Sequence, residues 1–180
     1  GCYILDAKEL KGTNIFLDIS SVGATINIMM AAVYAKGRTV IENAAREPEI
    51  IDIATLLNKM GARIHGMGTS TLVIDGVEYL KGCIHEIIPD RIEAATYVIM
   101  AAAMANDMRI ENIIPQHLEA IVMKLQEVGI NMEVGSDFIH VFKTDKPLKR
   151  TEILTKPYPG FATDVQQPFT VLLTQCEGQS

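Results

Sequence analysis

Three short segments of the 180-residue sequence place polar residues where a helix is expected to begin. In the first, Ser20, Ser21 and Gly23 precede an apolar run from Ile26 to Val33. Hydroxyl groups, free backbone N–H groups and the positive end of a helix dipole together suit the binding of a phosphate. The same residues also fit an ordinary serine N-cap, which composition alone favours.

The second and third segments carry charged residues where a helix is expected to begin. Arg91 follows Pro89 and Asp90, and it can form either an ion pair or a contact with an anion. Thr163 and Asp164 precede another apolar run, Val171 to Leu173. Taken alone, Asp164 is expected to be only a helix cap.

A polar loop, Glu42 to Glu49, connects a predicted strand to a predicted helix. Loops carry function disproportionately often, yet this one also fits a simple charged connection. The sequence contains no catalytic triad, Walker loop or GxGxxG motif. Cys83 and His85 are spaced like metal ligands, but two residues do not make a site. We therefore expect no metal and no cofactor.

The three segments correspond because the sequence repeats itself. Matched threonines at positions 25, 96 and 170 are 71 and 74 residues apart. This spacing indicates a repeating unit of roughly 70 residues, with the third copy incomplete.

Each unit is predicted to mix strands with two helices, in an α/β unit of order βαββαβ. The signals are helix caps, glycines that end helices, and short alternating runs. The first unit is expected to contain strands 14–18, 38–42, 62–65 and 71–74 and helices 21–36 and 47–60. The second is expected to contain helices 90–106 and 115–128 and strands 108–111, 130–134 and 138–142.

The two helices of a unit differ in their distribution of apolar residues. Helix 47–60 has one apolar stripe and one polar face, as expected of a surface helix. Helix 21–36 is apolar nearly all round, so we expect it to be central and covered on most sides.

Composition limits the class of protein. With 48% hydrophobic and 21% charged residues, the chain is expected to fold. Its longest apolar runs, about nine residues, are far shorter than a membrane span. A net charge of −6 gives no basic surface for nucleic acid. Three widely spaced cysteines and no visible signal peptide favour a cytoplasmic protein.

Several motifs together resemble one family. The similarity lies in Ser21 to Thr25, Glu42 to Glu49, Ile87 to Glu93, and Ala162 to Asp164 with Gln167 and Phe169 beyond. These segments resemble the bacterial UDP-N-acetylglucosamine 1-carboxyvinyltransferases, which are enolpyruvyl transferases. The similarity extends over essentially all 180 residues.

The resemblance implies an inside-out α/β barrel fold (α+β in some schemes) with six βαββαβ units, three in each of two domains. The active site is then expected in the cleft between the domains. On this interpretation, residues 1–87 are the last unit of one domain and residues 88–158 the first unit of the second. Residues 159–180 begin the next unit, so the sequence is expected to be a middle fragment.

The resemblance also implies an activity. Enzymes of this family transfer the enolpyruvyl group of phosphoenolpyruvate to the 3′-hydroxyl of UDP-N-acetylglucosamine, which is the first committed step of peptidoglycan synthesis. By similarity, Ser21, Val22 and Gly23 contact the UDP moiety. Ile19 and Ser20 belong to the same binding stretch, where family members often differ.

The other implied residues lie later in the sequence. Asp164 is expected at the sugar hydroxyl as its proton acceptor, with Thr163 beside it. Arg91 is expected at the domain junction, as an interdomain or anion contact. The family's Lys-Asn pair, reactive-cysteine loop and phosphate-binding arginine lie outside this stretch, so the chain alone is expected to be inactive.

Two alternatives remain at the level of sequence. A shikimate-type enolpyruvyl transferase would share the fold, but it would not explain Glu42 to Glu49. A non-catalytic αβ-repeat module would instead bind a partner through its apolar faces.

The full-length enzyme is expected to be monomeric, whereas the fragment is expected to associate or swap through uncovered helices.

Overall fold

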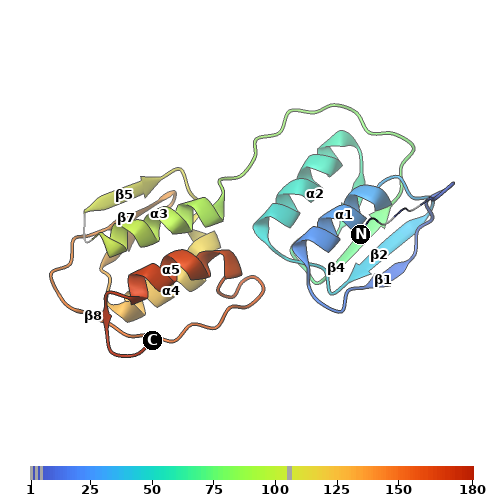
Figure 1. Cartoon of the computed structure of the whole chain (residues 1–180). Helices are drawn as coiled ribbons and strands as arrows, with labels where there is room; N and C mark the ends of the chain where they lie inside the picture. The colour runs from blue at the N-terminus through green and yellow to red at the C-terminus, as the bar shows by residue number, and fades with distance from the viewer. Residues whose placement is uncertain (1, 3, 5, 105–106) are drawn as a thin grey trace. The chain divides into compact units, whose positions relative to one another are not determined.

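The computed structural model describes residues 2, 4, 6–104 and 107–180, and its packing divides between residues 88 and 89 (Figure 1). Residues 1–88 form the first unit and residues 89–180 the second, each around its own hydrophobic core. Buried side chains of residues 159–180, including Phe161 and Phe169, belong to the same core as those of residues 89–158. A separate third repeat from residue 159 therefore stays a prediction.

The first unit contains a four-stranded sheet in the order β1-β2-β4-β3. β1 (Asn14–Phe16) pairs in parallel with β2 (Arg38–Glu42), and α1 (Val22–Ala32) forms the crossover between them. β4 (Thr71–Asp75) lies between β2 and β3 (Arg63–His65) and is antiparallel to both. The crossover places the start of α1 just beyond the carboxyl end of β1.

The second helix of this unit, α2 (Pro48–Met60), connects β2 to β3 and lies beside α1 on the sheet (Figure 1). Proline at its first position and Glu49 in its first turn suit a helix N-terminus. It ends at Gly61, whose φ of 110° is left-handed. The N–H groups of Gly61 and Ala62 bond to the carbonyls of Asn58 and Leu57, at 3.0 and 2.9 Å, which closes the last turn.

The second unit repeats part of this arrangement. Its three-stranded sheet has the order β5-β7-β6, which matches β2-β4-β3, and a short parallel pair, β8 with β9, flanks α5. The bounds are α3 (Arg91–Ala103), β5 (Met108–Glu111), η1 (Pro115–Leu118), α4 (Glu119–Val128), β6 (Met132–Val134), β7 (Phe138–Val141), β8 (Leu148–Lys149), η2 (Thr163–Val165), α5 (Gln166–Leu173) and β9 (Cys176–Glu177). The η elements are single 3₁₀ turns.

The elements follow one another as the predicted ranges do, but this succession is not the βαββαβ assigned to the repeat. The first unit reads β1-α1-β2-α2-β3-β4, which is βαβαββ, because one strand and not two separates the helices. β3 and β4 are antiparallel neighbours joined by a turn at Gly66 and Gly68, so they must follow each other in the sequence. The α/β class of the fold is unaffected.

The expectation of a covered first helix holds in the second unit only. α3 contacts α4, α5 and the strands β5 and β7, and it buries six of its residues. α1 has fewer partners, chiefly α2 and β4, and it buries only Thr25, Met29 and Ala32. Both helices are shorter than predicted, and residues 105 and 106 of the predicted helix 90–106 lie outside the described residues.

Candidate functional site

The start of α1 is formed by the residues singled out in the sequence. Ser21 is the N-cap, and its hydroxyl accepts a hydrogen bond from the N–H of Ala24 at 3.3 Å. The N–H groups of Val22 and Gly23, in the first turn, have no acceptor within the helix. A Cβ built on Gly23 would meet no atom within 4 Å, and Ile19 is 76% exposed. The first turn therefore presents open backbone donors and the positive end of the dipole to an accessible space.

The polar loop Glu42 to Glu49 packs directly against this helix start. Asn43, with a left-handed φ of 56°, donates its side-chain amide to the carbonyl of Leu17 at 2.8 Å. The hydroxyl of Ser20 donates to the carbonyl of Ala44 at 3.3 Å. The two motifs that are most specific in the sequence thus form one local structure.

Glu47, in the same loop, is only 6% exposed. Its Oε2 is buried and accepts no hydrogen bond within the described part of the chain. An unpaired buried polar group typically lowers stability by about 1–3 kcal/mol. The fold therefore keeps the side chain of Glu47 buried despite this cost.

Asp164 lies in the second unit, on the 3₁₀ turn that precedes α5. Val165 is fully buried, and Phe161 packs edge-on against Phe169 with centroids 5.3 Å apart, which anchors the turn on both sides. Thr163 and Asp164 remain exposed. Neither η2 nor α5 has a side-chain cap, so the interpretation of Asp164 as a mere helix cap is wrong.

Arg91 is the first residue of α3, after the N-cap Asp90. The Oδ1 of Asp90 accepts hydrogen bonds from the N–H groups of Ile92 and Glu93, at 2.8 and 3.3 Å. The guanidinium of Arg91 lies 5.7 Å from the ring centroid of Tyr158, in the loop that leads to Thr163. α3 also contacts η2, so Thr163 and Asp164 lie beside the helix that begins at Arg91.

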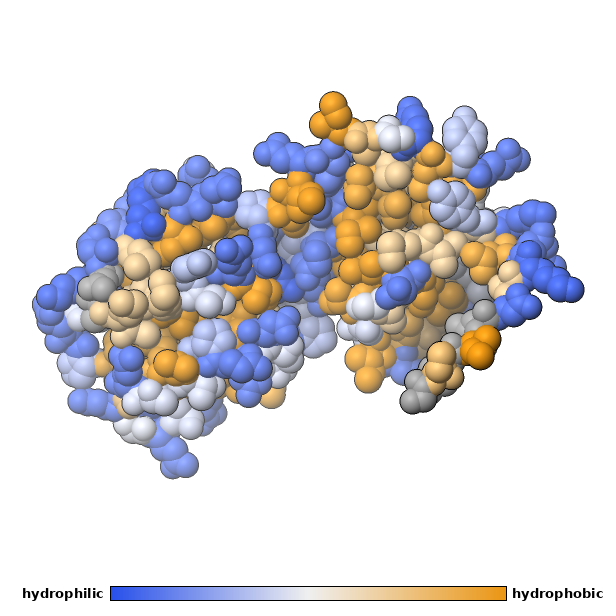
Figure 2. Space-filling view, turned by 45° about the horizontal axis from the view of Figure 1, so that its top comes forward, coloured by the Kyte–Doolittle hydropathy of each residue, from blue (hydrophilic) through white to orange (hydrophobic). Residues whose placement is uncertain are grey.

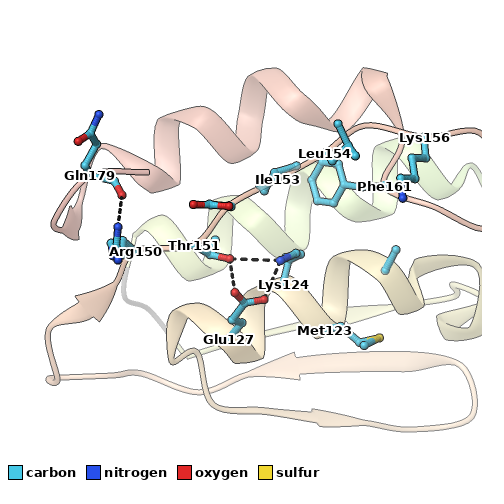
Figure 3. A pocket seen from close by; sticks show the side chains of 12 residues that line it. Met123, Lys124, Glu127, Arg150, Thr151, Ile153, Leu154, Lys156, Phe161 and Gln179 are labelled. Atoms are coloured by element: carbon cyan, nitrogen blue, oxygen red, sulfur yellow. Dashed lines mark hydrogen bonds and ion pairs between the residues drawn. The ribbon is translucent and has the colours of Figure 1, made fainter.

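A cavity of about 1000 Å³, which the sequence did not indicate, lies between α4 and residues 150–156 (Figure 3). Glu127 accepts hydrogen bonds from Lys124 Nζ at 2.7 Å and from the hydroxyl of Thr151 at 2.6 Å. These bonds, that from Lys124 first, hold the pKa of Glu127 below its ordinary value. The network ties residues 150–156 to α4. It depends on tertiary packing, which no local motif could reveal.

The metal-like Cys83–His85 pair has a structural explanation. The Nδ1 of His85 accepts from Lys59 Nζ at 3.3 Å, and its Nε2 bonds to Asp52 Oδ1 at 3.0 Å. His85 thereby fastens the irregular segment after β4 to α2. Within the described ranges, no cluster of three or more His, Cys, Asp or Glu side chains could hold a metal ion. Nor is any described helix long and apolar enough to cross a bilayer.

The fold and these motifs define a family. The sequence model of EPSP synthase (3-phosphoshikimate 1-carboxyvinyltransferase) matches residues 3–180. The chain therefore belongs to the EPSP synthase family, and the resemblance inferred from its motifs is confirmed.

Individual relatives give a more specific comparison than the family model does. The chain is 60% identical over 180 residues to UDP-N-acetylglucosamine 1-carboxyvinyltransferase 2 of Geobacillus kaustophilus (strain HTA426). It is equally similar to the protein of that name from Listeria monocytogenes serotype 4b (strain F2365). In both cases all of this chain matches 42% of the relative, so it spans less than half of their length.

Solved structures agree on the fold. The enolpyruvyl transferase NikO from Streptomyces tendae superimposes with a TM-score of 0.84 at 25% identity, over 96% of this chain and 44% of NikO. EPSP synthase from Acinetobacter baumannii gives a TM-score of 0.55 at 20% identity, over 83% of this chain and 34% of that one, which supports the fold alone.

Proposed function

We propose that this chain is part of an enzyme that transfers the enolpyruvyl group of phosphoenolpyruvate to the 3′-hydroxyl of UDP-N-acetylglucosamine. The relatives at 60% identity bear the name of that activity. The reaction would serve peptidoglycan synthesis in the cytoplasm, and through it cell shape and division. The observation that carries the proposal is the open first turn of α1 beside the loop Glu42 to Glu49.

Two groups of residues have proposed roles. The backbone N–H groups of Val22 and Gly23, with Ser21 and the neighbouring Ile19 and Ser20, would bind the diphosphate of the nucleotide, because a helix N-terminus is an anion site.

Asp164, with Thr163 beside it, would orient the sugar hydroxyl and accept its proton. Its carboxylate is exposed and forms no capping hydrogen bond, so it is available for this role. The hydroxyl oxygen attacks C2 of the enol while C3 gains a proton. The adduct then loses phosphate from C2 and a proton from C3, which restores the double bond of the enolpyruvyl group. The acid that protonates C3 is not assigned to a residue of this chain, and the 180 residues alone are proposed to be inactive.

The shikimate-type alternative is not favoured, because the relatives at 60% identity act, by name, on UDP-N-acetylglucosamine. The family model is named for the shikimate enzyme, so membership of the family does not by itself separate the two substrates. The non-catalytic module has no specific observation in its favour.

Titration of UDP-N-acetylglucosamine into the ¹⁵N-labelled chain tests the proposal. We expect amide shifts at Ser21 to Gly23, and weaker binding by Gly23→Ala, which adds a methyl group to the open space. Gly82→Ala is the matched control, because a Cβ there also meets no atom within 4 Å. Absence of shifts at millimolar ligand, or equal shifts with shikimate 3-phosphate, would overturn the proposal.

A further inference from the structure

The three matched threonines of the repeat share one hydrogen bond. Each hydroxyl donates to the carbonyl four residues earlier, at 2.8 Å: Thr25 to Ser21, Thr96 to Ile92 and Thr170 to Gln166. This back-bond is a common local habit of threonine in helices and by itself implies no function.

Thr25 differs from the other two in its surroundings. It is fully buried, whereas Thr96 and Thr170 are exposed. Its Oγ1 also accepts a hydrogen bond from the N–H of Ala45 at 3.0 Å, and no such second bond to Thr96 or Thr170 is found in the described residues. The hydroxyl of Thr25 therefore uses both its proton and a lone pair, and it joins two segments that are 20 residues apart.

The resulting chain of bonds runs from the loop into the first turn of α1. The N–H of Ala45 bonds to Thr25, and Thr25 bonds to the carbonyl of Ser21, the residue that caps the helix. The loop is fixed on its other side, because the N–H of Ala44 donates to the carbonyl of Ser70 at 2.9 Å. Ser20 adds a parallel bond to the carbonyl of Ala44.

We propose that Thr25 is a positioning residue, which holds the first turn of α1 at the distance and tilt required to bind a nucleoside diphosphate. The inference rests on the proposed function of that turn. Thr25 does not touch the ligand; it acts through Ser21, whose carbonyl it fixes. The loop Glu42 to Glu49 then contributes to binding through the backbone of Ala45 and not only through its charged side chains. Small displacements of a supporting group are enough to weaken a site of this kind.

Four forms of the 180-residue chain test this inference: wild type, Thr25→Val, Thr25→Ser and the matched control Thr96→Val. Valine keeps the shape of threonine but leaves the N–H of Ala45 without an acceptor, whereas serine keeps the hydroxyl. We expect Thr25→Val to weaken binding of UDP-N-acetylglucosamine about tenfold and to speed amide hydrogen exchange at Ala45. Thr25→Ser should stay within about threefold of wild type, and Thr96→Val should bind as wild type does.

The outcomes separate this inference from the proposed function. If wild type shows no shifts with the ligand, the proposed function fails. In that case Thr25→Val still tests whether Thr25 positions the turn. The measurements are hydrogen exchange at Ala45 and the amide shifts of Ser21 to Gly23. Unchanged exchange and unchanged affinity in Thr25→Val, or equal loss in Thr96→Val, would overturn the inference. If Thr25→Val does not fold, the ligand must slow exchange at Ala45 in wild type, and failure to do so overturns it.

Discussion

Ser21, Asp90 and Asp164 stand before corresponding helices of the repeat, yet their side chains have different partners. Ser21 and Asp90 cap their helices through the N–H groups of the first turn. Asp164 caps neither helix, because it lies within the 3₁₀ turn, whose N-cap is Ala162, and the N-cap of α5 is Val165. A carboxylate that forms no capping hydrogen bond at such a position is available for a ligand.

This difference predicts different stability effects. Asp90→Ala should lower the free energy of unfolding of the second unit by about 1 kcal/mol, because α3 loses its N-cap. Asp164→Ala should change it by less than about 0.5 kcal/mol, since the described part of the chain shows no capping hydrogen bond from Asp164. Urea unfolding followed by circular dichroism measures both. A loss of more than about 1 kcal/mol in Asp164→Ala would show that the carboxylate has a structural role.

The residue scale also shows a limit of sequence reasoning. The serine cap at Ser21 was predictable, because capping depends on residues within one turn. Thr25, Thr96 and Thr170 look equivalent in the sequence, but among the described residues only the Thr25 hydroxyl bonds to a distant segment. A periodic pattern identifies the matched positions, but the tertiary partner that distinguishes them is absent from the local sequence.

At the scale of elements, local signals predicted β2 and β5 with their observed bounds and α2 to within one residue. α2 and α4 both end at a glycine in the left-handed region, Gly61 and Gly129, as the sequence indicated. The first helix was predicted to end at Lys36, but α1 ends at Ala32, because the last residues of the apolar run form turns. The cavity beside α4 and the short pair of β8 with β9 had no local signal.

The two helix ends allow a direct test. Gly61→Ala and Gly129→Ala should each lower the free energy of unfolding by about 1 kcal/mol, because an L side chain is strained at φ of 110° or 105°. No neighbouring atom lies within 4 Å of the added Cβ, so a clash cannot explain the loss. Gly82→Ala serves again as control. Equal stability of all three variants in urea would contradict the assigned helix ends.

The network between α4 and Thr151 predicts a pH dependence. The pKa of Glu127 is lowered by Lys124 and then by Thr151, so above the ordinary value of 4.5 the pairing stabilises the folded state. As pH falls below 4.5 and through the lowered pKa, the unfolded state takes up the proton first and this stability is lost.

Melting temperatures measured from pH 7 to pH 3 should therefore fall more in wild type than in Glu127→Gln. Lys124→Met, which removes the main donor, should flatten the profile in the same direction. Identical profiles for the three proteins would show that Glu127 is not linked to folding in the way the structure indicates.

At the scale of the whole molecule, the two units cover their apolar helices unequally. α3 is enclosed by α4, α5 and two strands, whereas α1 keeps one side without a partner among the described residues of its unit. Figure 2 shows more continuous apolar surface on the visible face of the first unit than on that of the second. Because the chain spans 42% of its relatives, we propose that further units of a longer protein cover α1.

The uncovered side of α1 predicts self-association of the 180-residue chain. Met30 on α1 is 46% exposed, and Tyr34, just after the end of this helix, is 53% exposed. Burial of such a surface between copies is favourable at about 25 cal/mol per Å² of apolar area, so association should rise with concentration.

Light scattering coupled to size-exclusion chromatography measures the mass. Met30→Glu should shift the chain toward monomer, whereas Met123→Glu, on the 68% exposed Met123 of α4, should leave the mass unchanged. A wild-type chain that stays monomeric up to about 0.5 mM would mean that α1 alone tolerates its exposed apolar side. A loss of association in Met123→Glu instead would move the contact to the second unit.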